Sequence, residues 1–127
     1  MKDFKTYFII PAPPEDVYIA LTNEATARLW TGAPVVLDAQ VNGEFSFWDD
    51  AIIGHFIELE PSSKIVQEWY FGEQEVPSIV TIKLHPHKKG TSFEVLHTNI
   101  PDEAFEDMEE GWENPFVASL VEFYSED

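Results

Sequence analysis

The segment at residues 111–124 most constrains the fold, because it carries a wide apolar stripe almost to the end of the chain. Four large side chains recur at the spacing of one helix face: Trp112, Phe116, Leu120 and Phe123. Three more widen the stripe: Val117, Val121 and Tyr124. A helix with so wide an apolar side has to pack against another surface. The segment therefore predicts a terminal helix that closes over the rest of the protein.

The middle of the chain has the two-residue period of β-strands. Six strands are predicted, at residues 35–41, 44–48, 52–59, 64–71, 76–84 and 91–98. The segments between them are typical of turns: Asn42-Gly43, Asp49-Asp50, Pro61-Ser62-Ser63, Gly72-Glu73 and residues 85–90. Because no helical segment separates these strands, we expect neighbours to pair antiparallel, as a meander.

The amino end predicts a strand followed by two short helices. Residues 4–10 read as a strand that a proline-rich segment ends. A helix starting at Pro14 follows, since proline is tolerated in a first helical turn. A second helix is expected at residues 24–30, with Thr22 or Asn23 as its cap and a glycine after its end.

The last helical region is predicted to be bent. It begins at residues 101–110, where acidic side chains crowd toward the amino end that the helix dipole favours. Pro115 lies inside the pattern and removes one backbone donor, so we expect a kink there or a restart with Asn114 as cap.

Composition restricts the class of protein and its partners. The 127 residues suit a single domain spanning 1–127, and 7 basic against 24 acidic side chains give a net charge of −17. Nucleic acid and anionic membranes would repel such a chain. The absence of cysteine excludes disulfides, thiol catalysis and cysteine zinc sites. Without a signal peptide or a long apolar run, we expect a cytoplasmic protein with no membrane insertion.

The order of these elements, together with scattered motifs, resembles the helix-grip fold of START-like domains, the SRPBCC superfamily. Within it, the chain is similar to the branch named after the activator of heat-shock protein 90 ATPase. The resemblance covers nearly the whole chain and rests on residues 11–18 before Ala20-Leu21-Thr22, Trp30, Gly43, Gly54 with Glu58 and Pro61, residues 65–69, Gly90-Thr91, His97, and Gly111-Trp112 with Leu120.

This resemblance implies an α+β fold in which a curved antiparallel sheet wraps around a long C-terminal helix. The expected order along the chain is one strand, two helices, six strands and the terminal helix. Members of the superfamily bind hydrophobic small molecules, transfer lipids, cyclise polyketides or assist a chaperone. The terminal-helix proline and the strongly acidic surface depart from the family pattern. No residue of the sequence identifies a chaperone-contacting surface.

Strand alternation assigns a set of side chains to the sheet face beneath the terminal helix. Together with that helix, the candidate ligand-binding residues are Phe45, Phe47, His55, Gln67, Trp69, Phe71, Ile82, Phe93, Val95, His97, Trp112, Phe116 and Leu120. An aromatic-lined pocket with a few polar groups is the usual form of a small-molecule site. The same residues can equally fill a solid core, and the sequence leaves both alternatives open.

Three function classes follow. The first is a noncatalytic module that binds a hydrophobic small molecule or lipid between sheet and helix. The second is a cofactor-free enzyme on a polyketide-like or carbonyl substrate, with His55 or His97 as acid or base. The third is a chaperone-associated interaction domain, which needs an exposed apolar patch.

No cofactor or metal is expected. The His85-Pro86-His87 segment puts two imidazoles close together without a carboxylate or cysteine beside them, and it is typical of a hairpin turn. The sequence contains no phosphate loop and no nucleophile elbow.

Overall fold

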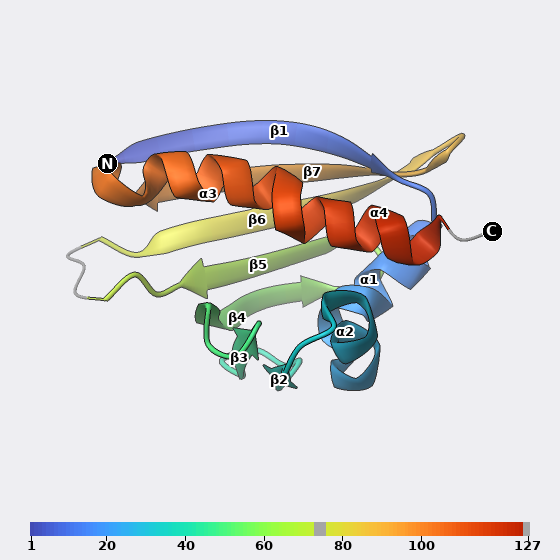
Figure 1. Ribbon diagram of the computed structural model, residues 1–127, viewed down its shortest axis with the longest axis horizontal. Helices are drawn as coiled ribbons and strands as arrows, with labels where there is room; N and C mark the ends of the chain where they lie inside the picture. Colours follow the sequence, from blue (N-terminus) through green and yellow to red (C-terminus); the bar gives the residue numbers. More distant parts are fainter. Residues whose placement is uncertain (73–75, 126–127) are drawn as a thin grey trace.

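The computed structural model, which describes residues 1–72 and 76–125, is built on one seven-stranded antiparallel sheet (Figure 1). The strands are β1 (Lys2–Ile10), β2 (Val36–Leu37), β3 (Glu44–Phe47), β4 (Ile52–Glu60), β5 (Lys64–Trp69), β6 (Ser78–His87) and β7 (Gly90–Ile100). The sheet order is β1-β7-β6-β5-β4-β3-β2, so β1 is an edge strand that pairs with β7, the last strand of the meander. The α+β fold class expected from the sequence is confirmed.

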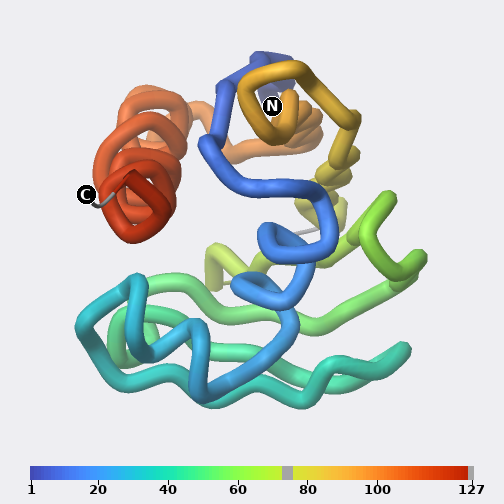
Figure 2. Tube along the Cα trace, turned by 90° about the vertical axis from the view of Figure 1, so that its right-hand side faces the viewer, coloured from blue at the N-terminus to red at the C-terminus, as the bar shows by residue number. Residues whose placement is uncertain are grey.

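The helices lie at one end and across one face of the sheet (Figures 1 and 2). They are α1 (Pro14–Thr22), α2 (Glu24–Thr31), a short turn η1 (Asp102–Ala104), α3 (Phe105–Gly111), a wider turn η2 (Trp112–Val117) and α4 (Ala118–Tyr124). In Figure 1, α3 and α4 run nearly in line along the sheet face, while α1 and α2 cover its end.

The two short helices predicted near the amino end are both present. Asn23 is the cap, because its side-chain oxygen accepts a hydrogen bond from the Thr26 backbone N–H at 2.9 Å. Gly32 ends α2 in the left-handed conformation, at φ 66°. The Trp30 indole donates to the Ala20 carbonyl at 2.7 Å, which fixes α2 against α1.

The terminal helical region is bent where the proline predicted it. Asn114 leaves the helical conformation (φ −144°, ψ 114°), and Pro115 follows it inside η2. Beyond the bend, the Tyr124 hydroxyl donates to the Asp16 carbonyl at 3.0 Å and ties α4 to α1. Trp112 and Phe116, on the two sides of Asn114, are both buried.

Two strand predictions need correction. The strand expected at residues 35–41 is reduced to β2, because the chain turns at Gln40, whose carbonyl accepts from the Gly43 N–H at 2.8 Å. The turn expected at residues 85–90 is only Lys88-Lys89, because β6 continues through Pro86. A proline is tolerated near a strand end, and His85 is held on the strand by Glu94 of β7 at 2.8 Å.

No helix in the part of the chain that the structure describes is long and apolar enough to cross a membrane.

Candidate functional site

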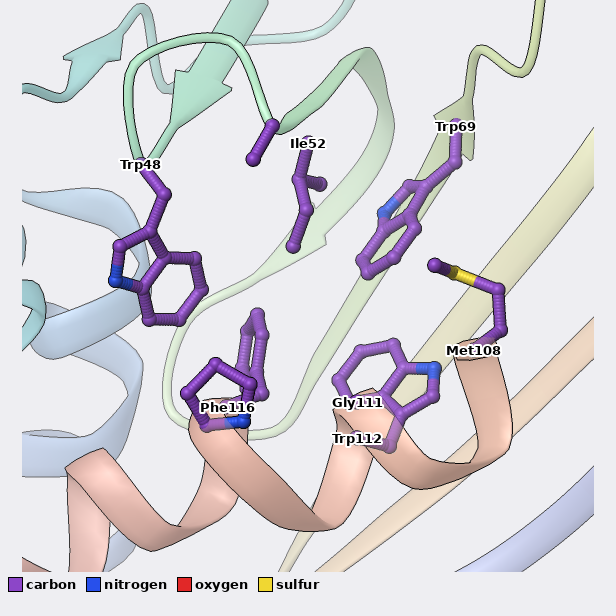
Figure 3. Close-up of a pocket in the computed structure, with 9 residues that line it drawn as sticks. Trp48, Ile52, Trp69, Met108, Gly111, Trp112 and Phe116 are labelled. Atoms are coloured by element: carbon purple, nitrogen blue, oxygen red, sulfur yellow. The ribbon is translucent and has the colours of Figure 1, made fainter. Parts of the chain in front are cut away.

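An apolar pocket of about 220 Å³ lies where the bent terminal helix meets the end of the sheet (Figure 3). The residues that line it come from the β3–β4 turn, β4, β5 and the terminal helical region: Trp48, Ala51, Ile52, Trp69, Met108, Gly111, Trp112, Pro115 and Phe116. No lining side chain carries a charge or an oxygen atom. The pocket therefore offers contact surface almost without polar groups.

Four aromatic rings form a continuous arc around this pocket. Trp48 contacts Phe116 with ring centroids 5.8 Å apart, and Phe116 contacts Trp112 at 4.6 Å. Trp112 then stacks on Trp69 at 5.0 Å with an interplanar angle of 23°. In Figure 3, Trp48 and Trp69 stand on opposite sides of the pocket with Ile52 between them. Each ring is thus held by a neighbour before any ligand arrives.

The two indoles from β5 and the terminal helix have their N–H groups already bonded. The Trp69 indole donates to the Gln67 side-chain oxygen at 2.8 Å. The Trp112 indole donates to Nδ1 of His97 at 3.1 Å. Since an indole has a single donor, these bonds fix the ring orientations and leave no N–H for a ligand.

His97 is fully buried behind the pocket, and its hydrogen bonds define its protonation state. Nδ1 accepts from Trp112, so a neutral ring carries its proton on Nε2. Nε2 lies 2.9 Å from the Ser78 hydroxyl, which donates onward to the Thr98 carbonyl at 3.1 Å. Burial lowers the pKa of His97 to about 3, and the Asp3 carboxylate offsets only part of that effect. The histidine is therefore neutral and has both nitrogens occupied.

Most of the predicted ligand-binding residues form a solid core, and three line the pocket. Trp69, Trp112 and Phe116 are the three. The others that point inward as predicted are buried: Phe45, Phe47, Gln67, Ile82, Phe93, Val95, His97 and Leu120. Phe71 is partly buried, with its ring 6.0 Å from that of His97. Their role in ligand binding stays a prediction.

The inward placement of His55 was wrong. Its Nδ1 lies 2.7 Å from the Tyr70 hydroxyl and its Nε2 3.8 Å from Glu68, both on the outer face of the sheet. Regular alternation along β4, counted back from an outward-facing Glu58, would turn His55 inward. A bulge between Phe56 and Glu58 interrupts that alternation, so Phe56 enters the core and His55 points away.

Several pocket residues lie outside the predicted set: Trp48, Ala51, Ile52, Met108, Gly111 and Pro115. Trp48 and Ala51 belong to a turn, and Trp48 has a left-handed backbone at φ 54°, so strand alternation says nothing about their direction. The sequence feature that could have suggested Trp48 is its position beside the Asp49-Asp50 turn. A bulky apolar side chain in a turn has no neighbour on an adjacent strand, so it has to pack against another element such as the terminal helix.

Among the described residues, no group of three or more histidine, aspartate or glutamate side chains is placed to hold a metal ion. His85 instead pairs with Glu94 on the outer face, and Lys5 lies 3.7 Å from the same carboxylate. Hydrogen bonding from His85 lowers the pKa of Glu94. This cluster joins β1, β6 and β7.

Comparison of the sequence with known families shows that residues 11–124 match the family model described as Activator of Hsp90 ATPase homolog 1-like protein. A Dictyostelium discoideum protein named activator of 90 kDa heat shock protein ATPase homolog is 32% identical over 88% of this chain and 30% of its own length. A human protein of the same name, homolog 1, is 26% identical over 87% of this chain and 33% of its own. The chain thus spans about a third of these curated relatives.

Solved structures agree on the fold. An Hsp90 activator from Plasmodium falciparum superposes with a TM-score of 0.83 at 27% identity, covering 93% of this chain and 92% of that one. The Aha1 dimer from Colwellia psychrerythraea reaches 0.83 at 18% identity, covering 99% and 100%. At 18% identity, the similarity to the Colwellia structure supports the fold only. Because the family model matches residues 11–124, the chain belongs to the family of Activator of Hsp90 ATPase homolog 1-like proteins.

Proposed function

We propose that this domain binds a small apolar molecule, or the apolar end of a larger one, in the pocket between sheet and terminal helix. The observation that supports it most is the arc of Trp48, Phe116, Trp112 and Trp69 around an open space of about 220 Å³. Apolar, largely preformed concavities are the usual small-molecule sites.

Size and charge narrow the class of ligand. A drug-sized site usually has about 300–1,000 Å³, whereas an engineered cavity of about 150 Å³ holds benzene. The 220 Å³ pocket suits a single ring or a compact branched group. A net charge of −17 and the absence of basic side chains from the lining disfavour carboxylates and phosphates, so fatty acids are poor candidates.

The test uses Gly111, because it lines the pocket and an added Cβ would meet no atom within 4 Å. Gly111→Leu should fill the space with a side chain while the helix is kept. In nuclear magnetic resonance titrations with neutral one-ring and branched aliphatic compounds, we expect the indole N–H signals of Trp48 and Trp69 to shift in the unmodified protein and to stay fixed in Gly111→Leu.

Ala118→Leu is the matched control, since Ala118 is exposed on α4 and does not line the pocket. It should bind like the unmodified protein. Shifts confined to surface residues, or equal shifts in Gly111→Leu and Ala118→Leu, would contradict the proposal.

An acid–base enzyme finds less support in this geometry. Neither His55 nor His97 lines the pocket: the first lies on the outer face, and the second has both nitrogens in hydrogen bonds. A general base has to reach the proton that it removes, directly or through one water. We therefore favour binding without catalysis.

A second candidate is contact with a 90 kDa heat-shock ATPase, which the names of the relatives suggest. The specific observation is a groove of about 330 Å³ on the outer face, where Val36 (62% exposed), Ile53 (37%) and Tyr70 (37%) meet. Apolar side chains gathered on an exposed face are typical of protein contacts.

This candidate is tested by adding the domain to the purified chaperone and measuring ATP hydrolysis. We expect stimulation that Ile53→Asp reduces. Ile57→Asp is the control, since Ile57 is as exposed (38%) on the same strand but lies outside the groove. No stimulation, or equal loss in both variants, would argue against this groove.

A further inference from the structure

We propose that the preferred occupant of the pocket presents a methylated ammonium group, such as a trimethylammonium head. This inference rests on the proposed function and deepens it, because it specifies the chemistry of the bound group. Three observations carry it: the aromatic rings that line the pocket, the absence of side-chain oxygen acceptors from that lining, and the net charge of −17.

The first observation is the aromatic lining of the pocket. Trp48, Phe116, Trp112 and Trp69 line one space, and Figure 3 shows Trp48 and Trp69 on opposite sides of it. Aromatic faces carry negative partial charge, and a cation within about 6 Å of a ring centroid is attracted, most strongly by tryptophan. Because the N–H groups of Trp69 and Trp112 are bonded to Gln67 and His97, the indoles keep these orientations.

The lack of acceptors decides which cation fits. A primary ammonium carries three N–H donors that need partners, and burying them unpaired is costly. The lining side chains contain no oxygen atom. A trimethylammonium group has no N–H and an apolar outer surface, so it meets Ile52, Met108 and the rings without leaving a donor unpaired.

The net charge of the whole chain, −17, favours a cation over a neutral ligand. Two acidic residues that follow wall residues in the sequence, Glu109 and Glu113, line a separate hollow against β1. A negative net charge raises the local concentration of cations and speeds their arrival.

The experiment compares choline with its neutral carbon isostere, in which a tert-butyl group replaces the trimethylammonium. Both have nearly the same shape, so hydrophobic contact alone would favour the neutral compound. Titrations followed by the indole N–H signals should give choline binding about 2- to 30-fold tighter. Added salt should weaken the binding of choline and leave that of the isostere unchanged.

The outcomes separate this inference from the proposed function. Equal or tighter binding of the neutral isostere overturns the cation preference and leaves apolar binding standing. Absence of any binding, by choline, the isostere and one-ring compounds alike, overturns both.

Substitution of Trp48 tests whether an aromatic ring causes the preference for choline over its neutral isostere. Trp48→Leu should bring the choline-to-isostere affinity ratio close to one, and Trp48→Phe should keep part of the preference. Trp48 is only partly shielded from solvent, so both variants are expected to fold. Tyr70→Leu removes an exposed aromatic ring outside the pocket and should change neither affinity. An unchanged ratio in Trp48→Leu overturns the assignment.

Discussion

At the scale of single residues, the buried His97 connects the sheet to the terminal helix. Its Nδ1 accepts from Trp112 of η2, and its Nε2 meets Ser78 of β6. Trp112, His97 and Ser78 are buried, and the Ser78 hydroxyl donates onward to the Thr98 carbonyl. Because an unpaired buried polar group costs about 1–3 kcal/mol, the network holds the Trp112 ring in one orientation.

The lowered pKa of His97 predicts how stability depends on pH. The ring takes up a proton near pH 3 when folded but near pH 6.5 when unfolded, so the unfolded state binds more protons between these values. Stability contributed by the neutral ring is present above pH 6.5 and is lost as pH falls toward 3. Between pH 7 and pH 5, about 2 kcal/mol of unfolding free energy should be lost through this residue.

The measurement is urea unfolding of the protein and of His97→Gln at both pH values. Gln does not titrate, so the variant should lose about 2 kcal/mol less than the unmodified protein over this range. The carboxylates are the same in both proteins and cancel in the difference. Parallel pH profiles would contradict the role assigned to His97.

At the scale of elements, two glycines lie in opposite environments. Gly111 ends α3 with helical angles (φ −64°, ψ −30°), and an added Cβ would meet nothing within 4 Å. At Gly54 of β4, an added Cβ would lie 1.9 Å from the Glu68 carbonyl oxygen on β5. The first glycine costs helix stability without a packing reason, while the second lets two strands approach.

Alanine substitution should therefore have opposite effects at these positions. Gly111→Ala should raise the free energy of unfolding by about 0.5–1 kcal/mol, because it lowers the backbone freedom of the unfolded chain. Gly54→Ala should destabilise, since the backbone of β5 would have to move. Denaturant midpoints of both variants test the pair. A destabilised Gly111→Ala would contradict the conclusion that Gly111 has no packing role.

Regular strands and the bulged strand β4 differ in how well alternation predicts which side chains are buried. Alternation placed Trp69, Ile82 and Phe93 correctly inside, since β5, β6 and β7 pair with continuous register there. It failed at His55, where a bulge in β4 breaks the two-residue period. A bulge is set by pairing with a neighbouring strand, so a single strand's sequence does not reveal it.

At the scale of the whole molecule, the net charge of −17 means that the carboxylates repel one another in the folded protein. The described ion pairs are few beside the 24 acidic residues, and most lie at the surface. Surface pairs contribute little, so they do not cancel the repulsion. Stability then depends on the core and on the helix–sheet contacts.

Salt should therefore stabilise this protein. Raising NaCl from about 0.02 to about 0.5 M shortens the Debye length from roughly 20 Å to roughly 4 Å and screens the repulsion between carboxylates. We expect the thermal unfolding midpoint to rise by several degrees. A nonionic osmolyte at matched osmolality controls for exclusion effects of the solute. A midpoint that falls with salt would mean that ion pairs dominate.

The sequence by itself determined the fold class, the order of elements and the inward side of most strands, because these depend on local periodicity and on breakers such as Pro115. It also named Trp69, Trp112 and Phe116. Only the tertiary structure decided that they share one pocket with Trp48, Ile52 and Met108. Turn side chains have no period, and whether a space stays open depends on how separate elements pack.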